Sequence, residues 1–282
     1  MKIRKPVVAG QFYPSDRAEL NTLITEIFSK EKDNINYDLA HHKIIGGVVP
    51  HAGYIFSAYQ AIHFFEIAKK CSTQFDTVII INPSHTGTGN EIAIDDNDSW
   101  ETPLGRTEID KDFSREMAIP ESDIEEEREH SGEVMLPLLQ HFLNYEFKIL
   151  PITIMHQTFE NAKQVANEIK QANEKLNKKI LIIASSDFSH FVHPNTGAKL
   201  DQKVIDEIFA LNTQGIEEVV RKNKISVCGY GPIMALMEYS KLLNHEPGIS
   251  ILKKGNSGDI IPSNEVVDYV SMLFYQEIKE KG

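Results

Sequence analysis

The stretch Thr77-Val-Ile-Ile-Ile-Asn-Pro-Ser-His85 combines two features that decide the fold, a short apolar run and a polar tail ending in histidine. Apolar, β-branched runs of this length are typical of buried strands. Similar runs occur at Lys43–Val49, Thr77–Ile81, Phe147–Ile154, Lys179–Ala184, Ile225–Val227 and Ile249–Lys253. We predict that all six are strands.

Segments with helical spacing of apolar residues lie among these runs. In the first of them, Leu20, Leu23 and Ile27 fall on one face. The predicted helices are Ser15–Lys30, Ser57–Lys69, Gly132–Asn144, Glu160–Lys175, Asp201–Ala210, Ile216–Arg221 and Pro232–Leu243. Val266–Tyr275 is interpreted as a strand followed by a short helix. Because apolar strands alternate with helices, we predict a layered α/β fold with helices on both faces of the sheet.

Two segments are predicted to be loops, Thr86–Arg106 and Pro120–Ser131. The second contains the acidic run Glu125–Glu129, which we interpret as a solvated turn or helix end. No linker rich in Pro, Gly or Ser divides the sequence. We therefore expect residues 1–282 to form a single domain.

The composition excludes several classes of protein. Among the 282 residues, 41 are acidic and 29 are basic, which gives a net charge of −12. This balance argues against a general nucleic-acid binder and against anchoring to an anionic membrane. Only Cys71 and Cys228 are cysteines, so a disulfide framework is not expected. Because neither a signal peptide nor an apolar run of membrane-spanning length occurs, we expect a cytoplasmic protein.

Residues that can bind metals or carry protons follow five of the predicted strands. They are His51 after Lys43–Val49, His85 after Thr77–Ile81, His156 after Phe147–Ile154, Asp187 and His190 after Lys179–Ala184, and Cys228 after Ile225–Val227. In open α/β sheets, the functional crevice lies at the carboxyl ends of the strands. Each residue alone has an ordinary structural explanation, but their recurrence predicts one shared pocket.

The residue types in this predicted pocket suit a transition metal. Fe(II), Cu and Zn all accept imidazole, and a thiolate shifts the preference toward softer or redox-active ions. Asp187 and His190 are three residues apart, so they are predicted to face the same site, one orienting and one shuttling protons. A thiol hydrolase, with Cys228 as nucleophile and a nearby histidine as base, is left open.

A second polar cluster, Glu129–Glu133, is interpreted as the start of a helix. Ser131 would be its N-cap, and Glu133 would lie in the first turn. At the pocket rim, His130 would face inward. The sequence has no Walker-type phosphate loop, no dinucleotide-binding glycine motif after the first strand and no Gly-x-Ser-x-Gly elbow.

Seven short motifs follow one another over nearly the whole chain. They are Arg4–Pro14, Pro50–Tyr54, Pro83–His85, Thr102–Gly105, Glu129–Ser131 with Glu133, Ser185–His190, and Cys228-Gly229 with Pro232-Ile233. In this order they resemble the Memo family, that is, mediator of cell motility and its prokaryotic homologues. That family is similar to the LigB-type class III extradiol dioxygenases. The resemblance implies a three-layer α/β/α sandwich around a central, largely parallel or mixed sheet.

The resemblance also implies a set of site residues. The dioxygenases hold non-haem Fe(II) with two His and one Glu, and in the Memo-like pattern Cys replaces the Glu. The implied metal ligands are His51, His85 and Cys228, with His190 as the catalytic acid/base and Asp187 beside it. The residues expected to line the pocket are Tyr54, Ser84, His130, Glu133, His156 and Ser186. Fe(II) is the first metal expected, with copper or zinc as alternatives.

The expected function is therefore that of a metal-binding protein, a non-haem iron or copper redox protein. Thiolate in place of carboxylate alters the ligand field and the risk of oxidation, so catechol cleavage is not expected. The alternative is a non-catalytic adaptor that binds a peptide or small molecule in the same pocket, as described for the animal protein. Tyr230-Gly231 differ from the basic residues of the animal proteins at these positions, which argues against a peptide-binding role. Prokaryotic members resemble partners of a radical-SAM-type system.

Overall fold

A computed structural model describes residues 1–243 and 246–278 of the chain. Within them, the larger sheet has eight strands, with β10, β11, β2, β8, β3, β7 and β4 in this order and β9 paired with β11. The strands are β2 (Lys43–Val49), β3 (Thr77–Pro83), β4 (Ile92–Ile94), β7 (Lys148–Ile154), β8 (Ile180–Ser185), β9 (His190–Val192), β10 (Gly248–Asn256) and β11 (Val266–Gln276). Four of the predicted strands thus form the centre of this sheet.

The sheet is mixed, as expected. β2, β8, β3 and β7 are parallel neighbours, whereas β11 runs antiparallel to β2, β10 to β11 and β4 to β7. The central strands are mostly apolar because both faces of the sheet are covered. In β8, Leu181 and Ile183 belong to one core cluster, and Ile182 and Ala184 belong to the other.

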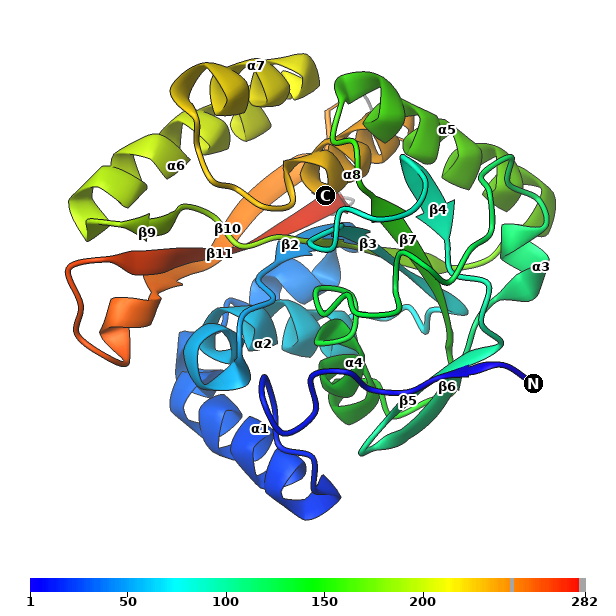
Figure 1. Cartoon of the computed structure of the whole chain (residues 1–282), viewed down its shortest axis with the longest axis horizontal. Helices are drawn as coiled ribbons and strands as arrows, with labels where there is room; N and C mark the ends of the chain where they lie inside the picture. Colours follow the sequence, from blue (N-terminus) through cyan, green and yellow to red (C-terminus); the bar gives the residue numbers. More distant parts are fainter. Residues whose placement is uncertain (244–245, 279–282) are drawn as a thin grey trace.

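Helices cover both faces of the sheet (Figure 1). One layer contains α5 (Phe159–Leu176), α6 (Pro194–Phe209), α7 (Thr213–Asn223) and α8 (Tyr230–Leu243), and the short α3 (Lys111–Ser114) contacts α5. The other contains α1 (Arg17–Glu31), α2 (Tyr54–Lys70) and α4 (Met135–Phe142). Single-turn helices are η1 (Lys32–Asn34), η2 (Tyr37–His41) and η3 (Ser257–Asp259). The expected three-layer α/β/α sandwich is confirmed.

A second, three-stranded sheet lies beside the larger one. It pairs β1 (Ile3–Arg4) with β5 (Ser99–Thr102) and β5 with β6 (Gly105–Glu108). The prediction of a loop over Thr86–Arg106 was therefore wrong in part, since β4, β5 and the start of β6 fall within it. β4 is apolar but has only three residues, and it pairs with β7. β5 and β6 are short and mostly polar, and β5 pairs with the N-terminal β1 and carries the buried Trp100.

Other predictions also differ from the structure. The helix predicted from Asp201 begins at Pro194. Ile225–Val227 belongs to no strand, although Ile225 and Val227 are buried in one of the two core clusters. Val266–Tyr275 contains no helix and lies wholly within β11. The helix predicted from Gly132 begins at Met135, with Val134 rather than Ser131 at the N-cap position.

The acidic run Glu125–Glu129 is not a solvated turn. The side chains of Glu125, Glu126 and Glu129 are all at most 1% exposed. They are buried because distant segments supply hydrogen-bond donors, among them Asn90 for Glu125 and Thr153 for Glu126. Three of the five residues of the run thus belong to the interior of the protein, whereas Glu127 and Arg128 are exposed.

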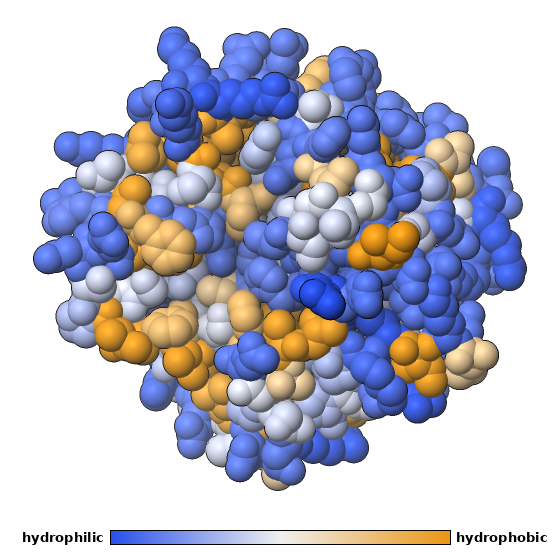
Figure 2. Space-filling view, viewed as in Figure 1, coloured by the Kyte–Doolittle hydropathy of each residue, from blue (hydrophilic) through white to orange (hydrophobic). Residues whose placement is uncertain are grey.

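The surface is mostly hydrophilic, in keeping with the net charge of −12 (Figure 2). Its most exposed large apolar side chains include Phe191 in β9 and Ile261 between η3 and β11. Across the described residues, no helix has both the length and the apolar character needed to traverse a bilayer.

Candidate metal centre

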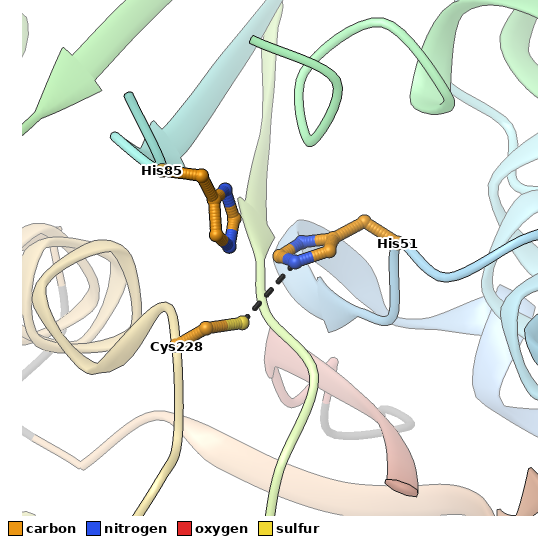
Figure 3. Close-up of side chains that lie close together, drawn as sticks. All are labelled: His51, His85 and Cys228. Atoms are coloured by element: carbon orange, nitrogen blue, oxygen red, sulfur yellow. Dashed lines mark hydrogen bonds between the residues drawn. The ribbon is translucent and has the colours of Figure 1, made fainter. Parts of the chain in front are cut away.

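Three potential metal ligands converge at the carboxyl edge of the central strands (Figure 3). His51 follows β2, His85 follows β3, and Cys228 immediately precedes α8, beside the loop after β8. One donor atom from each side chain lies within 4.8 Å of the other two. The Nε2 atom of His51 is 3.1 Å from the Cys228 Sγ atom, and the two imidazole rings are nearly perpendicular with centroids 5.3 Å apart. The convergence of His51 and His85 follows from the sheet, because β2 and β3 are parallel to β8 between them and end at the same edge. Cys228 is held beside them by its loop.

His51 is held in one orientation and one tautomer. Its Nδ1 atom lies 2.8 Å from the Ser185 hydroxyl, and that hydroxyl donates its proton to the Ser131 carbonyl at 2.7 Å. The hydroxyl must therefore accept from Nδ1–H, which leaves the Nε2 lone pair directed toward Cys228. The backbone N–H of His51 also donates to the Asp187 carboxylate at 2.8 Å.

His85 is oriented by Glu129 rather than by the sheet. The Glu129 carboxylate accepts from the backbone N–H of His85 at 2.5 Å and from its Nδ1 atom at 2.8 Å. Burial opposes ionisation of this carboxyl, but the hydrogen bonds and charge of His85 hold the pKa of Glu129 at about 2. A carboxylate bound to Nδ1 fixes the ring and increases the basicity of Nε2, as in many metal sites.

The Cys228 sulfur lies in a structured loop. It accepts a hydrogen bond from the backbone N–H of Asp187 at 3.2 Å, and the Cys228 carbonyl accepts from the Gln157 side chain at 2.7 Å. Burial and the nearby Asp187 carboxylate raise the pKa of the Cys228 thiol well above its usual value. The thiolate form therefore requires a neighbouring positive charge, which a metal ion supplies.

Further titratable groups surround the three ligands. The His130 ring has its centroid 4.5 Å from that of His85 and 5.5 Å from that of His51. Burial raises the pKa of the Asp187 carboxyl to about 6, although the N–H of His51 opposes the shift. His190 donates from Nδ1 to the Ser226 carbonyl at 2.8 Å, which leaves its Nε2 atom as a proton acceptor.

This arrangement can be compared with that of known proteins. A family model described as Memo-like protein matches residues 4–273. The chain belongs to the Memo family. A MEMO1 family protein of Desulfurococcus amylolyticus is 37% identical over 287 residues, which cover 98% of this chain and 100% of the relative. A MEMO1 family protein of Methanopyrus kandleri is 35% identical over 280 residues, or 96% of this chain and 98% of the relative.

A solved structure shows a weaker likeness. The uncharacterized protein JW3007 of Escherichia coli K12 gives a TM-score of 0.49 at 10% sequence identity, covering 81% of this chain and 99% of that chain. None of these names states a substrate or a metal, so the chemistry of this Memo-family site is argued from its own residues.

Some residues expected at the pocket act at its margins. The Tyr54 hydroxyl donates to the Val134 carbonyl at 2.6 Å and is buried at the start of α2. Ser84 bonds with the Thr86 hydroxyl, and Ser186 accepts from the backbone N–H of Gly229, next to Cys228. These side chains shape the loops that carry the ligands.

Two other expected residues lie elsewhere. Glu133 is fully buried but pairs with Arg4 at 2.7 Å rather than with the three ligands. His156 is exposed and pairs with Glu91 at 3.2 Å. The chain turns after β7 so that the next residue, Gln157, contacts the Cys228 loop instead.

Three residues that hold the ligands were not among those predicted: Glu129, Ser185 and Gln157. Glu129 and Ser185 each lie within a motif that the sequence analysis noted, and Ser185 is the last residue of β8. Their closeness in sequence to the expected site residues His130 and Asp187 could have indicated that they lie at the site. Gln157 had no such signal, because its partner is 71 residues away.

Proposed function

We propose that this Memo-family protein binds a redox-active transition metal, iron or copper, through Nε2 of His51, Nε2 of His85 and Sγ of Cys228. The observation that carries the proposal is the state of the two imidazoles. Both Nδ1 atoms are engaged by oxygen acceptors, and both Nε2 atoms are left for a metal beside a cysteine sulfur.

The donor set fits such a metal. Two neutral imidazoles and a thiolate suit iron and copper, whereas zinc would bind without supplying redox chemistry. Fe(II) is the first candidate, because the resemblance to the two-His, one-carboxylate dioxygenases favours it. When bound, the metal would supply one-electron chemistry and polarise a small molecule at an open coordination position.

The protein's own groups would control protons and orientation at this site. The Asp187 carboxyl, 3.9 Å from Nε2 of His51, would hold or release a proton near neutral pH. His190 would accept or donate a proton at its Nε2 atom. The backbone N–H of Asp187, which donates to the Cys228 sulfur, would stabilise the thiolate and tune the potential of the site.

A thiol hydrolase is less well supported by the geometry. Its base would be His51, whose Nε2 atom lies 3.1 Å from the sulfur. Burial, however, lowers the pKa of His51 and raises that of Cys228, so the ion pair that activates a catalytic cysteine is disfavoured. A non-catalytic adaptor and a radical-SAM-type partner stay predictions.

Metal analysis of anaerobically purified protein tests the proposal. We expect close to one iron or copper per chain in the wild type, and loss of most of it in Cys228→Ser and His51→Ala. Cys71→Ser and His156→Ala are matched controls outside the three-ligand set, and they should retain the metal. Equal metal content in Cys228→Ser and Cys71→Ser would refute the proposed centre. Ligand binding that persists without metal would instead favour the adaptor.

A further inference from the structure

The N-terminal motif Arg4–Pro14 has no part in the three-ligand set, yet its first residue is deeply buried. Arg4 is 6% exposed and extends from β1 beneath the loop that precedes α4. We propose that Arg4 is a positioning residue for the metal centre, which fixes the segment carrying Glu129 so that Glu129 can orient His85. This inference rests on the proposed function.

The Arg4 guanidinium makes three hydrogen bonds to this segment. Its Nε atom donates to the Glu126 carbonyl at 3.0 Å, and its Nη2 atom donates to the Glu129 carbonyl at 2.5 Å. Its Nη1 atom donates to the Glu133 carboxylate at 2.7 Å. The guanidinium carbon also lies 4.4 Å from the ring centroid of Trp100. One side chain therefore fixes three points of residues 126–133.

The Glu133 carboxylate completes the attachment of the N-terminal segment. It accepts from the backbone N–H groups of Val7 and Val8 and from the Tyr13 hydroxyl, at 2.8, 3.0 and 2.7 Å. Between these points, the Phe12 ring lies against His130 with centroids 4.7 Å apart. The segment is thus bound to both ends of the 126–133 loop.

Glu129 transmits this constraint to the metal ligand. Its carboxylate accepts from the backbone N–H and Nδ1 of His85, and from the backbone N–H groups of His130 and Ser131 and the Ser131 hydroxyl. His85 is the most exposed of the three ligands, with 35% of its side chain accessible, so it depends on this carboxylate for its orientation. By contrast, His51 is held by Ser185 and Asp187 and has no contact with Arg4.

The contacts require arginine in particular. Three acceptors at different angles match the planar, five-donor fork of a guanidinium, whereas a lysine ammonium is a compact point charge. Arg4→Lys should therefore keep the charge near Glu133 but lose at least one of the two carbonyl contacts. The effect on the metal should be intermediate between wild type and Arg4→Gln.

Titration of the metal-free, full-length protein with Co(II) tests this role, with thiolate-to-cobalt absorption as the signal. Loss of a group that orients a metal ligand typically weakens affinity about 10–100-fold. We expect roughly tenfold weaker binding in Arg4→Gln and a larger loss in Glu129→Gln. Because Arg4 acts through Glu129, the double variant should bind no more weakly than Glu129→Gln alone. Lys2→Gln, which removes the exposed ion pairs of Lys2 with Asp96 and Asp123, is the control.

Failure of this role and failure of the metal centre give different results. If His85→Ala binds Co(II) as tightly as the wild type, the metal centre is wrong and the role of Arg4 falls with it. If His85→Ala weakens binding but Arg4→Gln and Arg4→Lys do not, the centre stands and Arg4 does not position it. If the losses of Co(II) affinity in Arg4→Gln and Glu129→Gln multiply in the double variant, Arg4 does not act through Glu129, and the positioning role is again wrong. Should Arg4→Gln fail to fold, Arg4→Lys takes its place. Its Co(II) affinity, alone and combined with Glu129→Gln, then decides whether Arg4 positions the centre.

Discussion

Substitution of Ser185 by alanine tests how the protein sets the tautomer of His51. The hydroxyl is the acceptor for Nδ1–H of His51 and the donor to the Ser131 carbonyl, at 2.8 and 2.7 Å. Ser185, Ser131 and His51 are all at most 1% exposed, so water cannot replace the lost partner without rearrangement. The variant therefore leaves one buried donor and one buried acceptor unpaired.

The magnitude follows from these two groups. A buried polar group left without a partner costs about 1–3 kcal/mol, so with two such groups the free energy of unfolding of the metal-free protein should fall by roughly 2–6 kcal/mol. His51 also loses the contact that fixes its ring, and metal affinity should fall about tenfold, which corresponds to roughly 1.4 kcal/mol. Both effects should appear in the same variant.

Urea denaturation and Co(II) titration measure the two quantities separately. The chain has a single tryptophan, Trp100, which is buried and so reports unfolding by its fluorescence. Ser240→Ala is the matched control, since that buried hydroxyl donates only to the Leu236 carbonyl within α8. Because the Leu236 carbonyl still accepts a helical N–H within α8, the change should cost about 1 kcal/mol or less and leave Co(II) affinity unaltered. If Ser185→Ala behaves like Ser240→Ala in both assays, the tautomer assigned to His51 is wrong.

Two further predictions concern the stability of the fold. In Gly47→Ala the new methyl would lie 2.5 Å from the Met272 carbonyl oxygen of β11, so we expect the free energy of unfolding measured by urea denaturation to fall by about 3 kcal/mol. In the control Gly53→Ala the nearest atom lies at 3.5 Å, so the fall should be much smaller. Equal falls in the two variants would contradict the clash at Gly47. Burial raises the pKa of Glu126 from 4.5 to about 8, so its protonated form stabilises the fold below pH 4.5 and this contribution is lost as the pH rises toward 8. As the pH rises from 5 to 9, the free energy of unfolding of Glu126→Gln should therefore increase relative to that of the wild type in the same assay. The exposed Glu127→Gln should show no such increase. Parallel pH profiles for the wild type and Glu126→Gln would refute the burial of a neutral acid.

The central strands were predictable because their sequence carries a strong local signal. β2 spans the residues predicted for it, since both of its faces are buried and nearly every position is apolar. Ile225–Val227 carries the same local signal without being a strand. Ile225 and Val227 are buried in the core without pairing in a sheet, and a run of three residues is too short for periodicity to distinguish the two cases.

The positions of those candidate ligands that directly follow strands were predictable from the sequence. His51 and His85 follow parallel strands that share one neighbour, β8, so their meeting follows from the topology. Cys228 reaches them although no strand precedes it, because its loop is bonded to Asp187. The burial of Glu129 was not predictable, because the Arg4 side chain that bonds its carbonyl lies 125 residues earlier in the chain.

Because β11 is synthesised long after β2, one edge of β2 is unpaired for part of the time in which the chain is made. The pairs that β8 forms with β2 and β3 are available once Ser185 has been made, but the other edge of β2 stays open until Val266–Gln276 emerges, about 80 residues later. At translation rates of about 5–20 residues per second, this interval lasts several seconds. During it, an apolar strand that leads to His51 presents unpaired backbone groups to other nascent chains. All three proposed ligands are synthesised before that edge is covered, and so β11 pairs with β2 only after the candidate centre has been made.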